Sequence, residues 1–180
     1  MNIRAASLAA LAIITPCLAA DPGPALHFSP AENLEHVDDA LIDSAGRSID
    51  MAAYVMTDWT VMAALIRAAK RGVKVRIYLD GKRIGERKPS PIFRQLMSCP
   101  GIEVRMKRPK APSMHLKSYL IDGRLLRTGA ANFSASGLKR QDNDLVVIES
   151  QAAAAAFKKR FDAMFATGET VPRPWPEGPP

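Results

Sequence analysis

Apolar and polar positions change their spacing several times along the chain, and this predicts a strand–helix–strand unit in its first half. Residues 48–56 are mostly apolar and residues 73–79 alternate apolar with polar side chains, and both patterns are typical of strands. Between them, residues 58–71 carry apolar positions at helical spacing, and Gly72 ends that pattern. Two strands joined by a helix in this order predict parallel pairing with a right-handed crossover.

The same two spacings predict the other elements of a single α/β domain without internal repeats. Further strands are expected at residues 25–28, 102–106, 114–121, 124–128 and 145–149, and further helices at residues 31–45, 91–98 and 151–166. Residues 80–90 are polar and basic and contain glycine and proline, which predicts a mobile loop.

The two ends of the chain depart from this pattern. Residues 1–20 begin with a short positive segment, continue with an apolar run and end with small residues, so they are expected to be a secretory signal peptide. The alternative is a membrane anchor, for which the apolar run is short. Residues 171–180 contain five prolines and are expected to be a disordered tail. The mature domain is thus expected at residues 21–170 of a secreted or periplasmic protein.

Composition indicates a basic segment and predicts a fold without disulfides. The chain has a formal net charge of +7, and residues 67–110 contain fourteen Lys or Arg against three acidic residues. Such a segment fits a polyanion, although a solvated surface is the plain alternative. Cleavage of the leader would remove Cys17 and leave Cys99 as the single cysteine, so the fold is expected to need no disulfide.

Candidate chemistry is concentrated between residues 114 and 143. His115 and Lys117 are two residues apart, which places both side chains on one face of a strand. Asp122-Gly123 is a strong hairpin signal, and Asn132 is expected at the head of a short helix after the returning strand. A histidine, a lysine and an amide meeting at one strand end suit a phosphate group: Lys117 supplies charge, Asn132 supplies N–H donors, and His115 can attack or transfer protons.

These residues resemble the phospholipase D superfamily, whose signature is His-x-Lys-(x)4-Asp followed by a Gly-(Ser/Gly)-x-Asn-Phe-Ser stretch. The positions that match are His115, Lys117, Asp122, Gly129, Asn132, Phe133 and Ser134. The length and order of the elements are also similar to the small, secreted, single-motif nuclease branch of that superfamily. The resemblance implies a mixed, largely parallel sheet flanked by helices on both faces, in one domain.

The resemblance also implies a mechanism and a partner. His115 would attack phosphorus and form a phosphohistidine, while Lys117 and Asn132 would hold the non-bridging oxygens. A second histidine would protonate the leaving group, and because the chain has one copy of the motif, it would come from a second subunit of a homodimer with residues 141–144 near the two-fold axis. No metal or other cofactor is implied, so activity is expected to survive EDTA. Asp122 and Ser134 would support the site rather than react.

Two positions depart from the family pattern. Ala130 stands where the family often has Ser, which removes one hydrogen-bond donor from the phosphate site. Asn143 stands near the position where the family often has a Glu that orients the histidine, and Asp142 and Asp144 flank it. Either Asp, or the Asn143 carbonyl, is a candidate for that orienting role.

Three functions remain open from the sequence. The first is a nuclease that cuts DNA and possibly RNA with little sequence preference, because basic side chains that contact the backbone carry no base information. The residues expected to bind nucleic acid are Lys82, Arg83, Arg87, Lys88, Lys107, Arg108 and Lys110. The second is a lipid hydrolase of the phospholipase D type, for which the sequence predicts no clear apolar docking surface. The third is a catalytically weak polyanion-binding protein.

Overall fold

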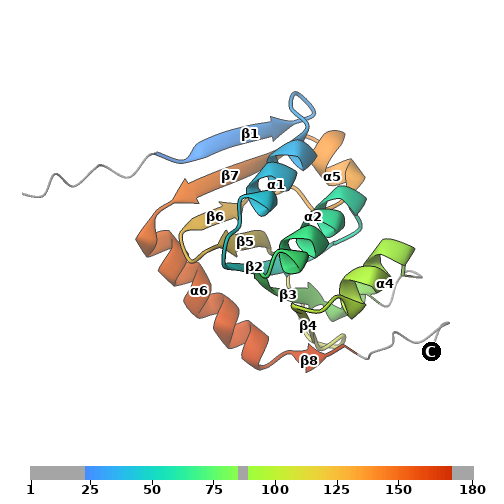
Figure 1. The fold of residues 1–180 in the computed structure, drawn as a ribbon. Helices are drawn as coiled ribbons and strands as arrows, with labels where there is room; N and C mark the ends of the chain where they lie inside the picture. Colours follow the sequence, from blue (N-terminus) through green and yellow to red (C-terminus); the bar gives the residue numbers. More distant parts are fainter. Residues whose placement is uncertain (1–22, 85–88, 172–180) are drawn as a thin grey trace, which may run out of the picture.

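In a computed structural model, the described residues are 23–84 and 89–171, and they fold into eight strands and six helices (Figure 1). The strands are β1 (Ala25–Ser29), β2 (Ser48–Ala53), β3 (Lys74–Asp80), β4 (Ile102–Lys107), β5 (Lys117–Ile121), β6 (Leu125–Thr128), β7 (Asn143–Glu149) and β8 (Glu169–Thr170). The helices are α1 (Leu34–Asp43), α2 (Trp59–Lys70), α3 (Gly81–Ile84), α4 (Pro91–Ser98), α5 (Ala135–Lys139) and α6 (Gln151–Ala166). The expected signal peptide, Arg87, Lys88 and the expected tail beyond Val171 lie outside the described residues.

All eight strands belong to one sheet in the order β1-β7-β6-β5-β2-β3-β4-β8. The strands β2, β3 and β4 pair in parallel, and every other neighbouring pair in this sheet is antiparallel. The expected mixed α/β sheet is therefore confirmed, but parallel pairs are its minority, which corrects the expectation of a largely parallel sheet. The difference arises because β5 pairs antiparallel with β2, and β6, β7 and β1 then extend the sheet from β5 in antiparallel pairs.

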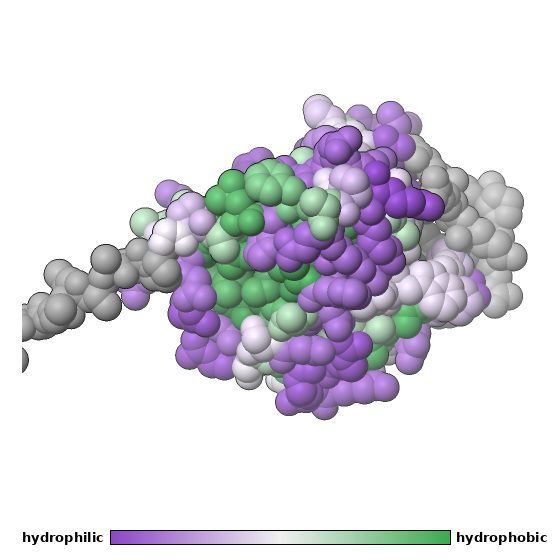
Figure 2. Space-filling model, turned by 90° about the horizontal axis from the view of Figure 1, so that it is seen from above, coloured by the Kyte–Doolittle hydropathy of each residue, from purple (hydrophilic) through white to green (hydrophobic). Residues whose placement is uncertain are grey.

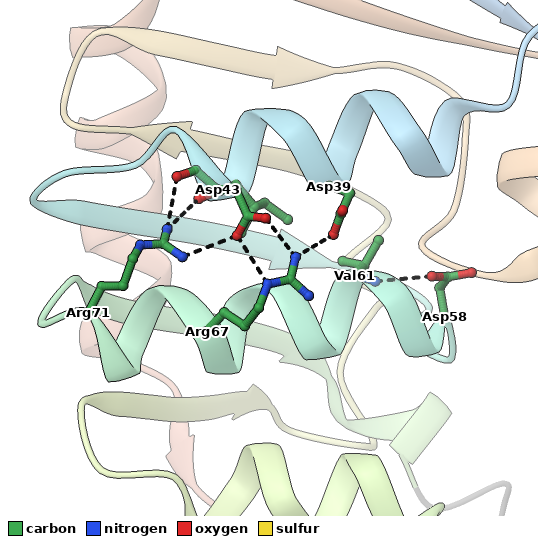
Figure 3. Close-up of polar contacts among 7 residues, drawn as sticks. Asp39, Asp43, Asp58, Val61, Arg67 and Arg71 are labelled. Atoms are coloured by element: carbon green, nitrogen blue, oxygen red, sulfur yellow. Dashed lines mark hydrogen bonds and ion pairs between the residues drawn. The ribbon is translucent and has the colours of Figure 1, made fainter.

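Helices cover both faces of the sheet, as expected. On one face, α1, α2 and α4 pack over the centre of the sheet and form the main hydrophobic core with residues such as Leu34, Leu65, Ile77 and Leu96 (Figure 1). On the other face, α6 supplies Phe161 and its apolar neighbours to two smaller clusters. The cap of α2 is Asp58, whose carboxylate accepts the Val61 N–H at 3.1 Å (Figure 3).

Two stretches expected to lack regular structure prove to be ordered. Residues 81–84 form α3, because the Asp80 carboxylate accepts the Arg83 N–H and caps this single turn. Val171, expected in the tail, is buried in the main core, because β8 pairs with β4 and keeps the chain against the sheet. Cys99 is a free and buried cysteine.

The register places the candidate chemistry at one edge of the sheet. Ala53, the last residue of β2, is opposite Lys117 on one side and Leu79 on the other. The carboxyl ends of β2 and β3 and the beginning of β5 therefore meet, and the residues that follow or precede these strands share that edge. Crevices outside the carboxyl ends of parallel strands are the usual place for ligands in such sheets.

Candidate active site

His115 and Lys117 lie together at this edge. The strand β5 begins at Lys117, three residues later than expected, so His115 precedes the strand and is exposed. The Nζ atom of Lys117 lies 2.9 Å from His115 Nδ1 and donates a hydrogen bond to the His115 carbonyl at 2.8 Å. The ring of Tyr54 lies with its centroid 4.3 Å from that of His115. The expected pairing of an imidazole with an ammonium group is therefore present within a single chain.

Lys117 is unusually buried for a lysine, with only 5% of its surface exposed. Burial removes water from its ammonium group and lowers the pKa of Lys117 from its ordinary value. The ammonium also lies 5.0 Å from the centre of the Tyr54 ring, a cation–π contact that offsets part of this cost. The edge thus holds a poorly hydrated cation, which attracts an anion more strongly than an exposed lysine does.

Asn132 belongs to the loop after β6 and is connected to Lys117 through a buried arginine. Arg127 donates from Nη1 to the Lys117 carbonyl at 2.7 Å and to the Ala131 carbonyl at 3.4 Å. The Asn132 Oδ1 atom is buried and has no hydrogen-bond partner among the described residues. Helix α5 begins at Ala135, so Asn132 precedes its cap rather than heading the helix as expected.

Ser134 and Asp144 shape this loop. Ser134 caps α5, since its hydroxyl accepts the Gly137 N–H at 3.1 Å. The Asp144 carboxylate accepts the Ala130 N–H at 2.9 Å. Gly129, which precedes Ala130, has φ of 140°. A Cβ there would meet the Asp144 carbonyl oxygen at 2.5 Å, so the loop approaches β7 as closely as glycine permits.

The expected orienting residues contact the backbone rather than His115. The Asn143 amide donates to the Gly137 carbonyl at 2.9 Å, and Asp144 is used by Ala130 as above. Asp142 is exposed. Among the residues that the structure describes, no carboxylate contacts His115, so the orienting role assigned to these three positions remains a prediction that a second subunit would have to fulfil.

Asp122 has a structural role in the β5–β6 hairpin. Its carboxylate accepts backbone N–H groups from Gly46, Arg47 and Ser48 at 2.7–3.0 Å, and its own φ is 54°. Burial opposes ionisation, but these three hydrogen bonds outweigh it and hold the pKa of Asp122 below its ordinary value. The residue therefore connects the far end of the β5–β6 hairpin to the beginning of β2.

Replacing Asp122 with asparagine is expected to lower the free energy of unfolding at pH 7 by about 1–2 kcal/mol, because a neutral amide accepts these N–H groups less strongly. A carboxyl with a lowered folded-state pKa stabilises the fold above its unfolded pKa and loses that contribution as pH falls. The difference between Asp122→Asn and wild type should therefore shrink between pH 5 and about pH 3 in urea titrations. Asp142→Asn, at an exposed carboxylate, is the matched control, and an equal effect of both substitutions would contradict the role of Asp122.

The basic segment divides into two parts. Arg67 and Arg71 pair with Asp39 and Asp43 across α1 and α2, far along the chain from the motif (Figure 3). The residues expected to bind nucleic acid lie elsewhere: Lys82 and Arg83 on α3, Lys107 at the end of β4, and Arg108 and Lys110 in the loop that leads to His115. Arg108 pairs with Glu169, and Arg83 donates to the Tyr54 hydroxyl at 2.6 Å. The cations nearest the motif in the fold thus gather at the same sheet edge.

Sequence reasoning missed Tyr54, Asp38 and Arg127. Tyr54 follows β2, and its ring contacts both His115 and Lys117. Arg127 and Asp38 form an ion pair with both side chains fully buried. A charged residue inside the apolar strand at 125–128 was the available signal for Arg127. No sequence signal marked Asp38 as buried, because charged residues on an amphipathic helix are ordinarily exposed.

The described residues contain neither a metal-binding cluster nor a membrane-spanning helix. No group of three or more His, Cys, Asp or Glu side chains there is placed to hold a metal ion. No helix in the described ranges combines the length and apolar character that crossing a membrane requires. The other two histidines make local contacts, His27 with Glu32 and His36 with Asn33.

The chain is similar to known proteins over most of its length. A family model described as "Cardiolipin synthase, PLD-like domain" matches residues 39–165. A "Phospholipase D" of Rickettsia conorii is 36% identical over 121 residues, which are 67% of this chain and 58% of the relative. A "Mitochondrial cardiolipin hydrolase" of Chlamydomonas reinhardtii is 29% identical over 126 residues, 69% of this chain and 54% of the relative. The chain thus spans somewhat more than half the length of the curated relatives it matches.

Two solved structures share the fold over most of this chain and nearly all of theirs. The crystal structure of Nuc from Salmonella typhimurium, a phospholipase D family member, superposes with a TM-score of 0.71 at 28% identity and covers 83% of this chain and 99% of that one. NucT from Helicobacter pylori superposes with a TM-score of 0.75 at 22% identity and the same coverage, a likeness of fold alone.

Proposed function

Because the chain belongs to the phospholipase D superfamily, among its small Nuc-like members, we propose that it is a phosphodiesterase that cuts nucleic acid with His115 as nucleophile. The observation that carries the proposal is the contact between the Lys117 ammonium and the His115 ring at an exposed sheet edge. That edge also holds Lys82, Lys107 and Lys110.

The chemistry follows from the types of group at this edge. A His115 ring nitrogen attacks phosphorus, a P–N bond forms and the bond to the leaving oxygen breaks. A second imidazole donates a proton to that oxygen, then takes one from a water molecule that attacks the phosphohistidine and releases His115. Lys117 and the Asn132 amide stabilise the negative charge on the non-bridging oxygens, and donors of this kind contribute about 3–4 kcal/mol each in comparable sites. No metal takes part in these steps.

The second imidazole requires a second copy of the chain. His115 is exposed in one subunit, and neither His27 nor His36 contacts the residues of the motif. A two-fold axis close to His115 would bring two copies of the same imidazole to one phosphate, which is how a cyclic dimer uses a single surface twice. A homodimer with its active site at the interface is therefore part of the proposal.

Nucleic-acid cleavage is expected to fall steeply with salt, because the cations at the site edge release counterions from the phosphate backbone when they bind. Purified protein should cut plasmid DNA and RNA in EDTA, with kcat/KM lower by at least about tenfold at 200 mM than at 50 mM salt. The charge-reversing pair Lys107→Glu and Lys110→Glu should lose most of this dependence, whereas Lys74→Glu, at the far end of β3, is the matched control. Turnover of labelled lipid with no cleavage of nucleic acid would contradict the proposal.

A lipid hydrolase is the second candidate, and one structural feature favours it beyond the names of the relatives. Leu26 and Phe28 on the edge strand β1 are more than half exposed, although the sequence predicted no apolar docking surface. Figure 2 views the molecule from the β1 side and shows apolar side chains gathered near the beginning of the described chain, with hydrophilic ones around them. A patch of this kind can rest on a lipid surface.

A further inference from the structure

A cavity of about 600 Å³ adjoins the site and has no role in the steps above. Tyr54 forms the wall between them, because its ring lines the cavity and also lies 4.3 Å from the His115 ring. Ser134, two residues after Asn132, lines the cavity as well. A group attached to a phosphate at His115 and Asn132 would therefore have this space on the other side of the Tyr54 ring.

The cavity combines apolar walls with a cationic and aromatic rim. Ile84 and the buried ring of Phe93 belong to its walls. At its rim, Trp59 is 61% exposed although it is a large aromatic residue, and Arg83 and Arg140 add two guanidinium groups. Flat apolar surfaces beside arginines are the features with which proteins hold unstacked nucleobases, through stacking and cation–π contacts.

We propose that this cavity, with Trp59 at its rim, binds the nucleobase next to the scissile phosphate of a single-stranded nucleic acid. The proposal rests on the proposed nuclease function and adds the form of the substrate. The volume lies within the range of about 300–1,000 Å³ that is common for small-molecule pockets, which is ample for one base. Arg83 and Arg140 favour a polyanion over the uncharged acyl chains that apolar walls alone would accept.

Strand preference follows from where the base must go. Inside a duplex the bases are paired and stacked, so a base reaches the cavity only after it has been flipped out at a cost of a few kcal/mol. A single strand presents its bases without that cost. The chain is therefore expected to cut a single strand at least about tenfold faster than the duplex of the same sequence.

The test removes a base from the substrate as well as the Trp59 side chain from the protein. Single-stranded oligonucleotides of one sequence carry an abasic site at successive positions around one preferred cleavage point, and the wild type is expected to cut about tenfold more slowly when the base next to that point is missing. Trp59→Ala is expected to cut the intact strand about tenfold more slowly than the wild type does, and to cut intact and abasic strands at similar rates. Trp59→Phe is expected to keep the wild-type difference between the two strands. Phe28→Ala, an exposed aromatic outside the cavity, is the matched control and also retains it.

A binding measurement separates the failure of this proposal from that of the proposed function. The chain has two tryptophans, so in a His115→Ala, Trp175→Phe protein the fluorescence comes from Trp59 alone. Quenching by the intact strand and much less by the abasic strand is expected. Equal discrimination in wild type and Trp59→Ala, no effect of the abasic site, or quenching by cardiolipin vesicles but not by oligonucleotides would each overturn the proposal. A wild type that cuts no nucleic acid would instead contradict the proposed function. Arg140→Ala provides a second variant should Trp59→Ala fold poorly.

Discussion

Replacing His115 with alanine is expected to lower turnover of the preferred phosphodiester by about 10⁴-fold or more, because loss of the proposed nucleophile removes the covalent route altogether. Stability should change little, since His115 is exposed and its polar contacts in the described residues are to Lys117. The measurements are kcat and KM beside thermal unfolding. His27→Ala is the matched control, because His27 is paired with Glu32 outside the motif. Substantial turnover in His115→Ala would remove His115 from the mechanism.

A mixture of wild type and His115→Ala tests whether one phosphate needs two copies of this imidazole. In the proposed homodimer, equal amounts unfolded and refolded together give one quarter wild-type dimers, half mixed dimers and one quarter variant dimers. If each site uses both histidines, the mixture retains about one quarter of the activity of an equal total amount of wild-type protein. If every subunit works alone, it retains about one half. A value near one half in a mixture whose subunits have exchanged would contradict the shared site.

The parts of the site that a local sequence pattern carries were predictable. The spacing of His115 and Lys117 is two residues, and the structure brings their side chains into contact. The Asp122-Gly123 turn and the boundaries of α6 also follow from turn chemistry and helical spacing, which act between neighbours in sequence. The signal peptide and the dimer stay predictions, because the first lies outside the described residues and the second involves another chain.

The parts that depend on distant residues were not predictable. The balance of parallel and antiparallel pairs depends on which strands become neighbours, and β1 pairs with β7 from the other end of the chain. The contact of Tyr54 with His115 arises because β2 and β5 are adjacent, more than sixty residues apart in sequence. The carboxylate of Asp38 faces Arg127 across 89 positions, and no pattern in either segment announces the pairing.

The Asp38–Arg127 pair yields the largest expected effect on stability. Both side chains have 0% exposure, two guanidinium nitrogens donate to the two carboxylate oxygens at 2.9 and 3.0 Å, and the Tyr119 hydroxyl donates to the same carboxylate. Arg127→Leu leaves a buried carboxylate without its cation and is expected to lower the free energy of unfolding by about 3–5 kcal/mol in urea titrations. The matched control is Arg67→Leu, which breaks an exposed Arg–Asp pair and should cost less than about 1 kcal/mol.

The loss of stability in Arg127→Leu should also depend on pH, in a direction that identifies the unpaired Asp38 carboxylate as its cause. Burial raises the pKa of Asp38, and Arg127 opposes that rise, so the pKa climbs further when the arginine is removed. When a carboxyl has a raised pKa in the folded state, the fold loses stability as pH rises above the unfolded pKa of that carboxyl, near about 4. The deficit of Arg127→Leu should therefore be largest at pH 7 and should shrink towards pH 4. A deficit that is constant with pH would mean that lost packing, rather than an unpaired Asp38, is responsible.

The same pair should affect catalysis, because Arg127 also holds the Lys117 and Ala131 carbonyls and so fixes the distance between the ammonium and the Asn132 loop. In Arg127→Lys, the cation remains but the Nη1 group that bonds both carbonyls is lost. We therefore expect kcat to fall by a larger factor than 1/KM at temperatures where the variant is fully folded. A small misplacement of catalytic groups is known to cost about 10²-fold in rate. If Arg127→Lys and wild type had equal kcat under those conditions, the arginine would serve the fold alone, and the relative position of Lys117 and Asn132 would have to be set by the backbone around Gly129.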